Sequence, residues 1–440
     1  MKIIGIDIGT TTISAVVADG LRVVQKYTVA NGCDLRTECD WGRAQDTEKI
    51  VAKAKAVLDE ILDLDNDIHA IGLTGQMHGI LYADKNGKAV SPLYTWQDGS
   101  GNQREFGGKS VCEILAEDGF SAATGYGMVT YLYHSKKGLV PKTAASLCTI
   151  ADYFGMALTG RVAPLVHISQ AAGMGLYNCK KRVFMSETLA KHGANPALAP
   201  TITAEMEPLG TYRGIPVFAS LGDNQASFLG SVRDTSNTIL VNVGTGSQIS
   251  VLSDRCDVGN GIEARPLTKD CYLLVGSALC GGAAFAALEQ FFREYAVAAG
   301  ASDVSQYDIM KSLLEHHKGQ NEAWQVKTTF AGTRENPAQT GSIFGITTAN
   351  FHPATLIRGV LNGMVDELYN MYQVMQKQAE ISCLRLVASG NGIRKNPLLQ
   401  QILGERFGMP MEVEQNEEEA AFGAAISAQN YYIGTGLKAL

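Results

Sequence analysis

Residues 3–19 read IIGIDIGTTTISAVVAD, and residues 238–254 read TILVNVGTGSQISVLSD. When Gly9-Thr10 is aligned with Gly244-Thr245, the apolar positions of the two stretches coincide. Each copy has an apolar alternating run, a turn of small and hydroxyl residues, and a second apolar run. That order is typical of a β-hairpin with glycine and threonine at its tip. The repeat therefore predicts a duplicated fold with one hairpin in each half.

The two hairpin tips suit a phosphate group. Glycines let the backbone turn tightly, so that several N–H groups and hydroxyls converge on one point. Asp7 in the first copy is replaced by Asn242 in the second, so only the first offers a carboxylate for a hydrated Mg²⁺. An ordinary hairpin with a threonine-rich tip is the alternative. The second copy of the motif at residues 242–247 favours the phosphate site.

The composition limits the kind of protein. A length of 440 residues predicts two domains or one very large one, and 45% hydrophobic with 18% charged residues argues against disorder. The net charge of −7 argues against a nucleic-acid partner. The nine cysteines are scattered without a CxxC pair, which indicates reduced thiols and a cytoplasmic location. We expect neither a signal peptide nor a membrane partner.

Hydrophobic spacing predicts the main elements of the first half. Asp46 is the expected N-cap of a helix that runs through residues 50–61. Residues 68–74 are expected to form a strand, and 144–158 a helix that ends at Gly160. Residues 217–221 form a further expected strand.

The second half is expected to contain a long amphipathic helix over residues 356–368 and a strand over 385–388. A small-residue helix over 417–429 closes the chain. The domain join is expected as a short hinge near 225–236, just before the second hairpin.

A group of polar and aromatic residues follows two expected strand ends. Residues 75–79 read GQMHG, and 94–98 read YTWQD. Amides, an imidazole, an indole and a carboxylate suit a sugar, which needs hydrogen-bonding partners on its edge and an apolar or aromatic surface on its face. A buried structural histidine is the alternative for His78.

Two further glycine motifs have functional and structural interpretations. Asp223, in LGDNQ, is placed to act as a general base on an attacking hydroxyl, or to close an Asx-turn. Gly390-Asn391-Gly392, followed by Asn396, would let a planar base lie close to the backbone, or would form a tight strand-to-helix turn.

In this order, DIGTTT, GDNQAS, NVGTGSQ, SGNGIRKNP and EEEAAFGAAISA resemble the FGGY family of carbohydrate kinases over nearly the whole chain. The resemblance implies an α/β fold of two duplicated ribonuclease H-like domains, the actin/sugar-kinase/Hsp70 ATPase fold, with a cleft between them. Residues 1–230 would form the N-terminal domain with the sugar site and first phosphate loop. Residues 231–440 would form the C-terminal domain with the second phosphate loop and the adenosine site.

The resemblance also implies ATP-dependent phosphorylation of a ketose at a terminal hydroxyl, with ATP and Mg²⁺ as cofactors. GQMHG is similar to the ketose kinases, and TWQDG, ATGYG and IADYF look more like their sedoheptulokinase branch. Asn224 instead suits the xylulokinase pattern, so the sugar stays open between sedoheptulose and xylulose. The small-molecule sugar and ATP are the expected partners, and the assembly stays open between a monomer and a homodimer.

Each motif residue receives an implied role. Asp223 would be the catalytic base, and Asp7 would hold the metal. The implied sugar contacts are Gln76, Met77, His78, Trp96, Asp98 and Asn224. The implied ATP contacts are Thr10, Thr11, Thr12, Gly244, Thr245, Gly246, Gly282, Gly390, Gly392 and Asn396. A catalytically silent sugar or nucleotide sensor and an actin- or Hsp70-like ATPase remain the alternatives; intact Asp7 and Asp223 argue against the first, and GQMHG argues against the second.

Overall fold

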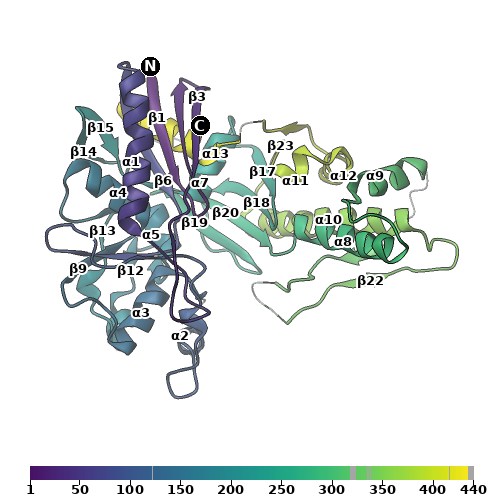
Figure 1. Ribbon diagram of the computed structural model, residues 1–440, viewed down its shortest axis with the longest axis horizontal. Coiled ribbons are helices and arrows are strands. Elements are labelled where there is room, and N and C mark those ends of the chain that lie inside the picture. Colours follow the sequence, from purple (N-terminus) through teal and green to yellow (C-terminus); the bar gives the residue numbers. More distant parts are fainter. Residues whose placement is uncertain (121, 318–323, 334–335, 337, 416, 435–440) are drawn as a thin grey trace. The chain divides into compact units, whose positions relative to one another are not determined.

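The computed structural model describes residues 1–120, 122–317, 324–333, 336, 338–415 and 417–434 (Figure 1). The chain forms two compact units. Unit 1 comprises Met1–Arg233, Arg265–Tyr272 and Glu418–Leu440, and unit 2 comprises Asp234–Ala264 and Leu273–Glu417.

The sheet of unit 1 is built around strand β1. Its hydrogen-bonded order is β14-β15-β6-β1-β2-β3, and β16 also pairs with β6. The strands are β1 (Lys2–Ile8), β2 (Thr12–Asp19), β3 (Arg22–Ala30), β6 (Ile68–Gly75), β14 (Pro208–Tyr212), β15 (Ile215–Phe218) and β16 (Leu221–Gly222). Strand β1 runs antiparallel to β2 and parallel to β6, which confirms the first predicted hairpin.

The side chains of β1 alternate between two helical layers. Ile4, Ile6 and Ile8 join the core that includes α1 (Thr47–Leu64), whose predicted N-cap Asp46 accepts a hydrogen bond from the N–H of Lys49. The opposite face of the sheet carries α13 (Glu419–Tyr432), which also packs on α7 (Asp223–Ser231). Because strand residues alternate between faces, Asp7 lies on the face of α13 and α7.

Helix α13 approaches β1 and β6 at backbone distance. A Cβ on Gly5 would lie 1.8 Å from the carbonyl oxygen of Ala421, and one on Gly72 would lie 2.1 Å from that of Ala424. Glycine on the strands and alanine on the helix therefore allow this close packing. It also explains why the closing helix, which follows the second half in sequence, is grouped with unit 1 by its contacts.

We expect Gly5→Ala to lower the melting temperature by several degrees, because a Cβ there must displace α13. Overpacking of this kind costs about 1–3 kcal/mol. Differential scanning calorimetry would test it against Gly404→Ala, since a Cβ on Gly404 meets no atom within 4 Å. Equal melting temperatures for the two variants would contradict the close packing.

Two predicted elements differ in the structure. Residues 144–158 are not one helix: β9 (Ala144–Cys148) pairs with β7 (Leu81–Asp84), and α4 (Ile150–Thr159) follows. The reason is a capping box in which Thr149 and Asp152 fix the start of α4. The expected hinge near 225–236 overlaps α7, which leaves only residues 232–237 between that helix and the next strand.

Unit 2 repeats the core pattern of unit 1. Its sheet order is β19-β20-β18-β17-β23-β24, and the adjoining ends of β19 and β20 lie in the segment Arg265–Tyr272 that is grouped with unit 1. The strands are β17 (Thr238–Val243), β18 (Ser247–Ser253), β19 (Ile262–Thr268), β20 (Cys271–Ala278), β23 (Arg385–Ser389) and β24 (Met411–Val413). Strand β17 runs antiparallel to β18 and parallel to β23, as β1 does to β2 and β6. The duplicated α/β fold is thereby confirmed.

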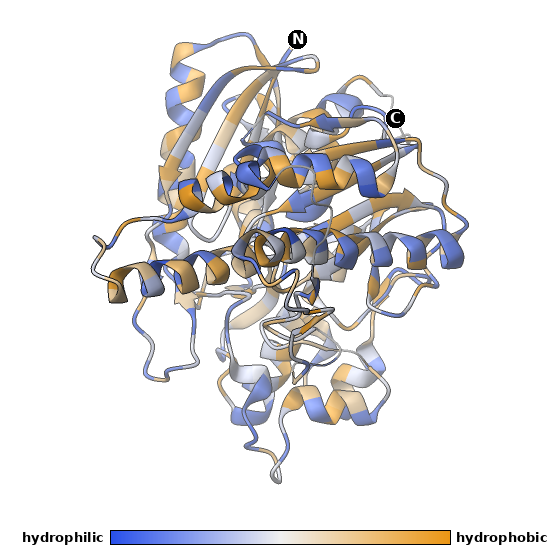
Figure 2. Cartoon of the chain, turned by 90° about the vertical axis from the view of Figure 1, so that its right-hand side faces the viewer, coloured by the Kyte–Doolittle hydropathy of each residue, from blue (hydrophilic) through white to orange (hydrophobic). Residues whose placement is uncertain are grey.

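Helices complete unit 2, and its long helix contains the predicted residues 356–368. The helices are α8 (Gly282–Ala298), α9 (Tyr307–His316), α10 (Pro353–Ala379), α11 (Asn391–Arg394) and α12 (Pro397–Phe407). Figure 2 shows hydrophobic and hydrophilic residues alternating along the helices, as expected of amphipathic helices.

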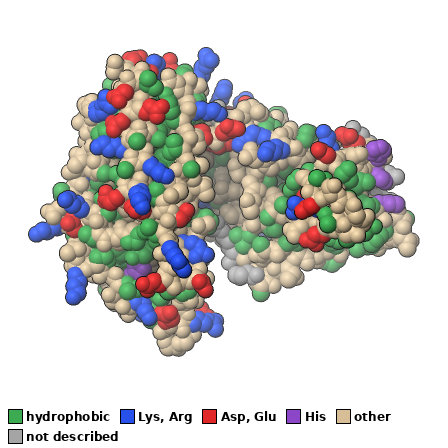
Figure 3. Space-filling view, in the orientation of Figure 1, with side chains coloured by type: hydrophobic (Ala, Val, Ile, Leu, Met, Phe, Trp, Pro, Cys, Tyr) green, Lys and Arg blue, Asp and Glu red, His purple; other side chains and the backbone are tan. Residues whose placement is uncertain are grey.

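On the face visible in Figure 3, basic and acidic side chains are interspersed. None of the helices in the described part of the chain combines the length and hydropathy needed to cross a bilayer.

Candidate active site

The first hairpin tip is held from behind by two buried amides. Asn31 donates from its side chain to the carbonyl of Gly9 (2.8 Å) and from its backbone to that of Thr11 (2.9 Å). Gln45 Nε2 donates to the carbonyl of Thr10 (2.9 Å). In a planar trans peptide, the C=O and the next N–H point in opposite directions. The N–H groups of Thr10, Thr11 and Thr12 are therefore turned away from these amides, as a phosphate site requires.

The second tip is built by the same principle with different donors. The N–H groups of Gly282 and Ala283, at the start of α8, donate to the carbonyls of Gly244 (3.0 Å) and Thr245 (2.9 Å). This orientation turns the N–H groups of Thr245 and Gly246 away from α8. Gly282 is glycine because a Cβ there would lie 2.3 Å from the carbonyl oxygen of Gly244.

The structure brings together Thr10, a predicted ATP contact, and the predicted sugar contacts Gln76 and Trp96. Trp96 Nε1 donates to Thr10 Oγ1 (2.9 Å), and Thr10 Oγ1 donates to Gln76 Oε1 (3.4 Å). Trp96 is 47% exposed although its nitrogen is bonded, so the indole presents a surface to a ligand. The expected sugar residues Gln76 and Trp96 thus adjoin Thr10, at the tip of the first hairpin.

His78 and Met77 follow Gln76 in the GQMHG segment, and Met77 is buried. His78 Nδ1 is 2.6 Å from the carbonyl oxygen of Gly173, so Nδ1 donates, and the ring stacks on Tyr126 with centroids 4.7 Å apart. Met77 is buried, and its methyl group lies 3.3 Å from the position that a Cβ on Gly222 would take. The peptide before Asp223 therefore packs against the GQMHG segment.

Asp98 has a structural explanation in the described contacts. Its carboxylate accepts hydrogen bonds from the N–H groups of Ser100 (3.0 Å) and Arg43 (3.3 Å), and the residue is buried. These bonds join two loops behind Trp96. The sugar contact implied for Asp98 stays a prediction.

Asp223 begins α7, and its carboxylate accepts hydrogen bonds from the next residue, Asn224, which in turn contacts a side chain from a distant segment. Asp223 Oδ1 accepts from the N–H (2.7 Å) and from Nδ2 (3.4 Å) of Asn224. Asn224 Oδ1 in turn accepts from Arg265, which is buried and lies in the short segment of unit 1 contributed by β19. Gln225 Nε2 fixes the same segment by donating to the carbonyl of Pro266 (3.0 Å).

The environment of Asp223 raises the pKa of its carboxyl from 3.8 to about 6. Desolvation raises this pKa, whereas the charge of Arg265 and the hydrogen bonds from Asn224 lower it. A base with such a pKa is mostly ionised at neutral pH and still accepts a proton readily.

We expect the acid limb of the kcat/KM profile to have an apparent pKa of about 6, with activity lost as Asp223 is protonated at lower pH. Arg265→Gln removes a charge that favours the ionised form, so the limb should move to higher pH. Arg265→Lys, which keeps the charge, is the matched control. Superimposable profiles for all three proteins would refute this electrostatic role.

Asp7 carries the feature expected of a cation ligand. Its Oδ1 is buried without a hydrogen-bond partner. Burial, followed by the charges of Asp223 and Glu418, raises the pKa of this carboxyl from 3.8 to about 7. A cation would relieve both the desolvation and the repulsion, and hydrated Mg²⁺ needs only one or two protein carboxylates. Among the described residues, no cluster of three metal-ligating side chains forms. The residues present therefore fit Mg²⁺.

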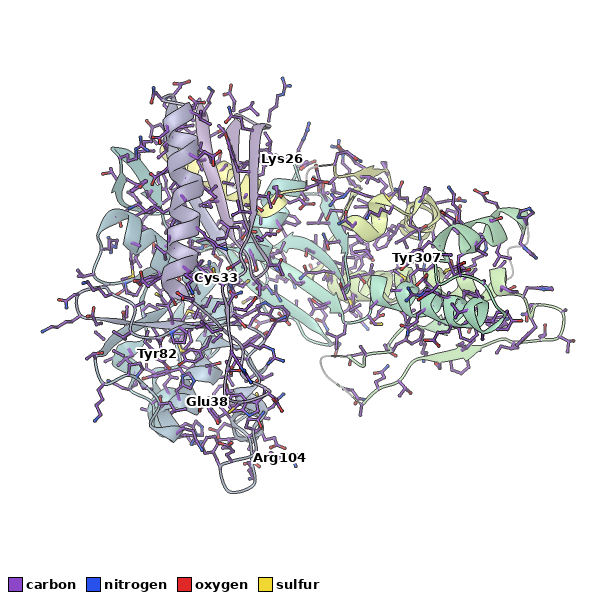
Figure 4. All side chains as sticks on the ribbon, viewed as in Figure 1. Lys26, Cys33, Glu38, Tyr82, Arg104 and Tyr307 are labelled. Atoms are coloured by element: carbon purple, nitrogen blue, oxygen red, sulfur yellow. The ribbon has the colours of Figure 1, made fainter. Side chains whose placement is uncertain are left out.

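Unit 2 contains a cavity of about 890 Å³ next to its hairpin. Its lining includes the predicted residues Gly282, Gly392 and Asn396. Sequence reasoning missed other lining residues, namely Phe285, Tyr307, Lys311, Arg358 and Lys395. Tyr307, labelled in Figure 4, stacks on Phe285 with centroids 5.6 Å apart.

The predicted glycines near this cavity also have a packing role. A Cβ on Gly390, whose φ is +91°, would lie 2.5 Å from the carbonyl oxygen of Val243, and one on Gly392 would lie 2.8 Å from the same atom. Asn396 caps α12 by accepting from the N–H of Leu399 (3.1 Å). The tight strand-to-helix turn is therefore present, and it shapes one wall of the cavity.

Residues 2–230 match the N-terminal domain of the FGGY family of carbohydrate kinases, and residues 233–430 match its C-terminal domain. The chain therefore belongs to the FGGY family of carbohydrate kinases, and it is an enzyme of that class.

Individual relatives span nearly the whole chain. The chain is 26% identical to the sedoheptulokinase of Mus musculus, with 96% of each chain covered. It is 24% identical to the xylulose kinase of Staphylococcus xylosus, over 97% of this chain and 90% of that protein. The solved xylulose kinase of Rhodospirillum rubrum superimposes with a TM-score of 0.84 at 20% identity, over 98% of this chain and 90% of that one.

Proposed function

We propose that the chain is an ATP-dependent ketose kinase that phosphorylates a terminal hydroxyl, with sedoheptulose as the preferred sugar and xylulose as the alternative. The observation that carries the proposal is Asp223, a carboxylate with one oxygen fixed by Asn224 and a pKa raised to about 6. It lies in one compact unit with Gln76 and Trp96, the side chains best suited to a sugar.

In this reaction Asp223 accepts the proton of the sugar hydroxyl while that oxygen bonds to the γ-phosphorus of ATP. The bond from this phosphorus to the β,γ-bridging oxygen breaks, and ADP leaves. Phosphoryl transfer depends mainly on positioning and charge neutralisation. Thr10, Thr11 and Thr12, and also Gly244, Thr245 and Gly246, would hold phosphate oxygens. Asp7 would hold Mg²⁺, which would supply positive charge to neutralise the phosphates.

The cavity of unit 2 is the proposed adenosine site. Its paired rings Phe285 and Tyr307 offer an apolar surface, and Lys311, Arg358 and Lys395 supply positive charge. This combination suits a base and ribose joined to an anionic phosphate chain.

The preference for sedoheptulose rests on the similarity to sedoheptulokinase and on the TWQDG and ATGYG motifs. The glycines of ATGYG, residues 123–127, pack closely against neighbouring residues. A Cβ on Gly125 would lie 1.8 Å from the carbonyl oxygen of Trp96, and one on Gly127 would lie 2.3 Å from Ile80 Cγ2. Gly125 therefore packs against the backbone of Trp96, and Gly127 packs against Ile80. In this proposal the exposed indole of Trp96 contacts the sugar.

A kinase screen tests the proposal. ADP release would be measured with sedoheptulose, xylulose, ribulose, fructose, gluconate and glycerol at saturating Mg-ATP, and mass spectrometry would identify the phosphorylated sugar. The highest kcat/KM is expected for sedoheptulose, by about tenfold or more per lost contact. A clear advantage for xylulose would select the alternative, and turnover of glycerol or gluconate alone would reject the ketose class.

A further inference from the structure

One buried side chain behind the first hairpin tip joins the two ligand sites of unit 1. Gln45 lies in the short strand β5 (Ala44–Gln45) and is fully buried. Its Nε2 donates to the carbonyl of Thr10 (2.9 Å) and to Asp34 Oδ1 (3.0 Å), and its Oε1 accepts from Gln76 Nε2 (3.1 Å).

These bonds close a ring of three residues. Gln45 donates to the Thr10 carbonyl, Gln76 donates to Gln45, and Thr10 Oγ1 donates to Gln76 Oε1 at 3.4 Å. Trp96 donates into the ring at Thr10 Oγ1. Buried hydrogen-bond networks of this kind are disturbed as a unit, because an unpaired polar group there is costly.

We propose that Gln45 is a positioning residue that couples sugar binding at Gln76 and Trp96 to nucleotide binding at the Thr10 tip. A sugar that contacts the amide of Gln76 or the face of Trp96 holds the ring in one arrangement. The nucleotide then meets a tip that is already ordered, so it binds more tightly. By thermodynamic linkage, the nucleotide must then raise the affinity for the sugar by the same factor.

This inference rests on the proposed function, and calorimetry separates the two. Dissociation constants would be measured for Mg-ADP and for the ketose with the highest kcat/KM, each alone and in the presence of the other. In the wild type, each ligand should tighten the other by about 5–150-fold. In Gln45→Met, which keeps the length of the side chain and removes its hydrogen bonds, the factor should fall towards one, with a lower kcat.

Tyr82→Phe is the matched control, because it removes a different buried hydrogen bond of unit 1, the one between the hydroxyl of Tyr82 (labelled in Figure 4) and His134 Nδ1 (3.0 Å). It should keep the wild-type coupling factor. Should Gln45→Met fail to fold, Gln45→Glu carries the same test, because it keeps the shape and loses both donated bonds.

Wild-type coupling in a folded Gln45 variant would overturn the inference, as would independent binding in the wild type. A wild type that phosphorylates no ketose would reject the proposed function instead, whatever the Gln45 variants do.

Discussion

Replacing Asp223 by asparagine is expected to lower kcat for the preferred ketose by about 10²–10⁴, the usual contribution of a general base. The sugar dissociation constant should change little. Asparagine has the shape of aspartate, and its side-chain oxygen can still accept from the N–H of Asn224, which is 2.7 Å away in the wild type. What is lost is the negative charge that accepts the proton of the sugar hydroxyl.

Single-turnover kinetics and calorimetry on Asp223→Asn would separate chemistry from binding. Asp63→Asn is a suitable control, since Asp63 pairs with Arg213 on the surface of unit 1 at 2.7 Å. Near-native kcat in Asp223→Asn would remove Asp223 from the role of base. A large loss of sugar affinity with unchanged kcat would make it a binding residue.

The elements that the sequence predicted correctly are those whose signal is local. Strand β1 and its hairpin are visible because apolar alternation, a glycine turn and a second apolar run follow one another within a few residues. The same holds for β17 and for α1, whose N-cap Asp46 precedes a helical apolar stripe. The prediction of a helix over residues 144–149 was wrong because it used the apolar spacing alone. The capping box of Thr149 and Asp152 starts the helix at Ile150.

The parts of the candidate site that the sequence did not predict depend on long-range contacts. Arg265 approaches Asn224 from far along the chain, and neither EARPL nor its spacing marks a functional arginine. Asn31 and Gln45 were missed because their function is to satisfy carbonyls of a tip that is distant in sequence. For Asp98, the sequence motif suggested a sugar contact and gave no sign of a structural role. In the structure its carboxylate accepts hydrogen bonds from two backbone N–H groups.

The duplication itself supplies the second large expected effect. In β1, Asp7 lies opposite Ser14 of β2 and Thr74 of β6. Asn242 has the equivalent position in β17, opposite Gln248 of β18 and Ser389 of β23. The amide of Asn242 donates to Ser389 Oγ (2.8 Å), so a neutral residue is accommodated at this point of the fold. Asp7→Asn would therefore test function at a position where the fold tolerates asparagine.

Asp7→Asn is expected to reduce kcat by about 10²-fold or more, because a metal ion contributes several kcal/mol of charge stabilisation to such a reaction. The same variant should be more stable than the wild type in Mg²⁺-free buffer at pH 8. The pKa of Asp7 is raised from 3.8 to about 7 in the folded protein, so the unfolded chain loses this proton first. The free energy of unfolding therefore falls as pH rises from about 4 to 7. Above pH 7 the carboxyl is ionised in both states, and the folded protein bears the whole cost of burying its charge.

Melting temperatures of both proteins at pH 5 and pH 8, with and without Mg²⁺, would test this argument. The advantage of Asp7→Asn should be larger at pH 8 than at pH 5, and Mg²⁺ should raise the melting temperature of the wild type alone. Each kcal/mol of relief corresponds to about 2–4 °C in a domain of this size. A destabilised variant with normal Mg²⁺ dependence would show that Asp7 is a structural residue of the hairpin and not a metal ligand.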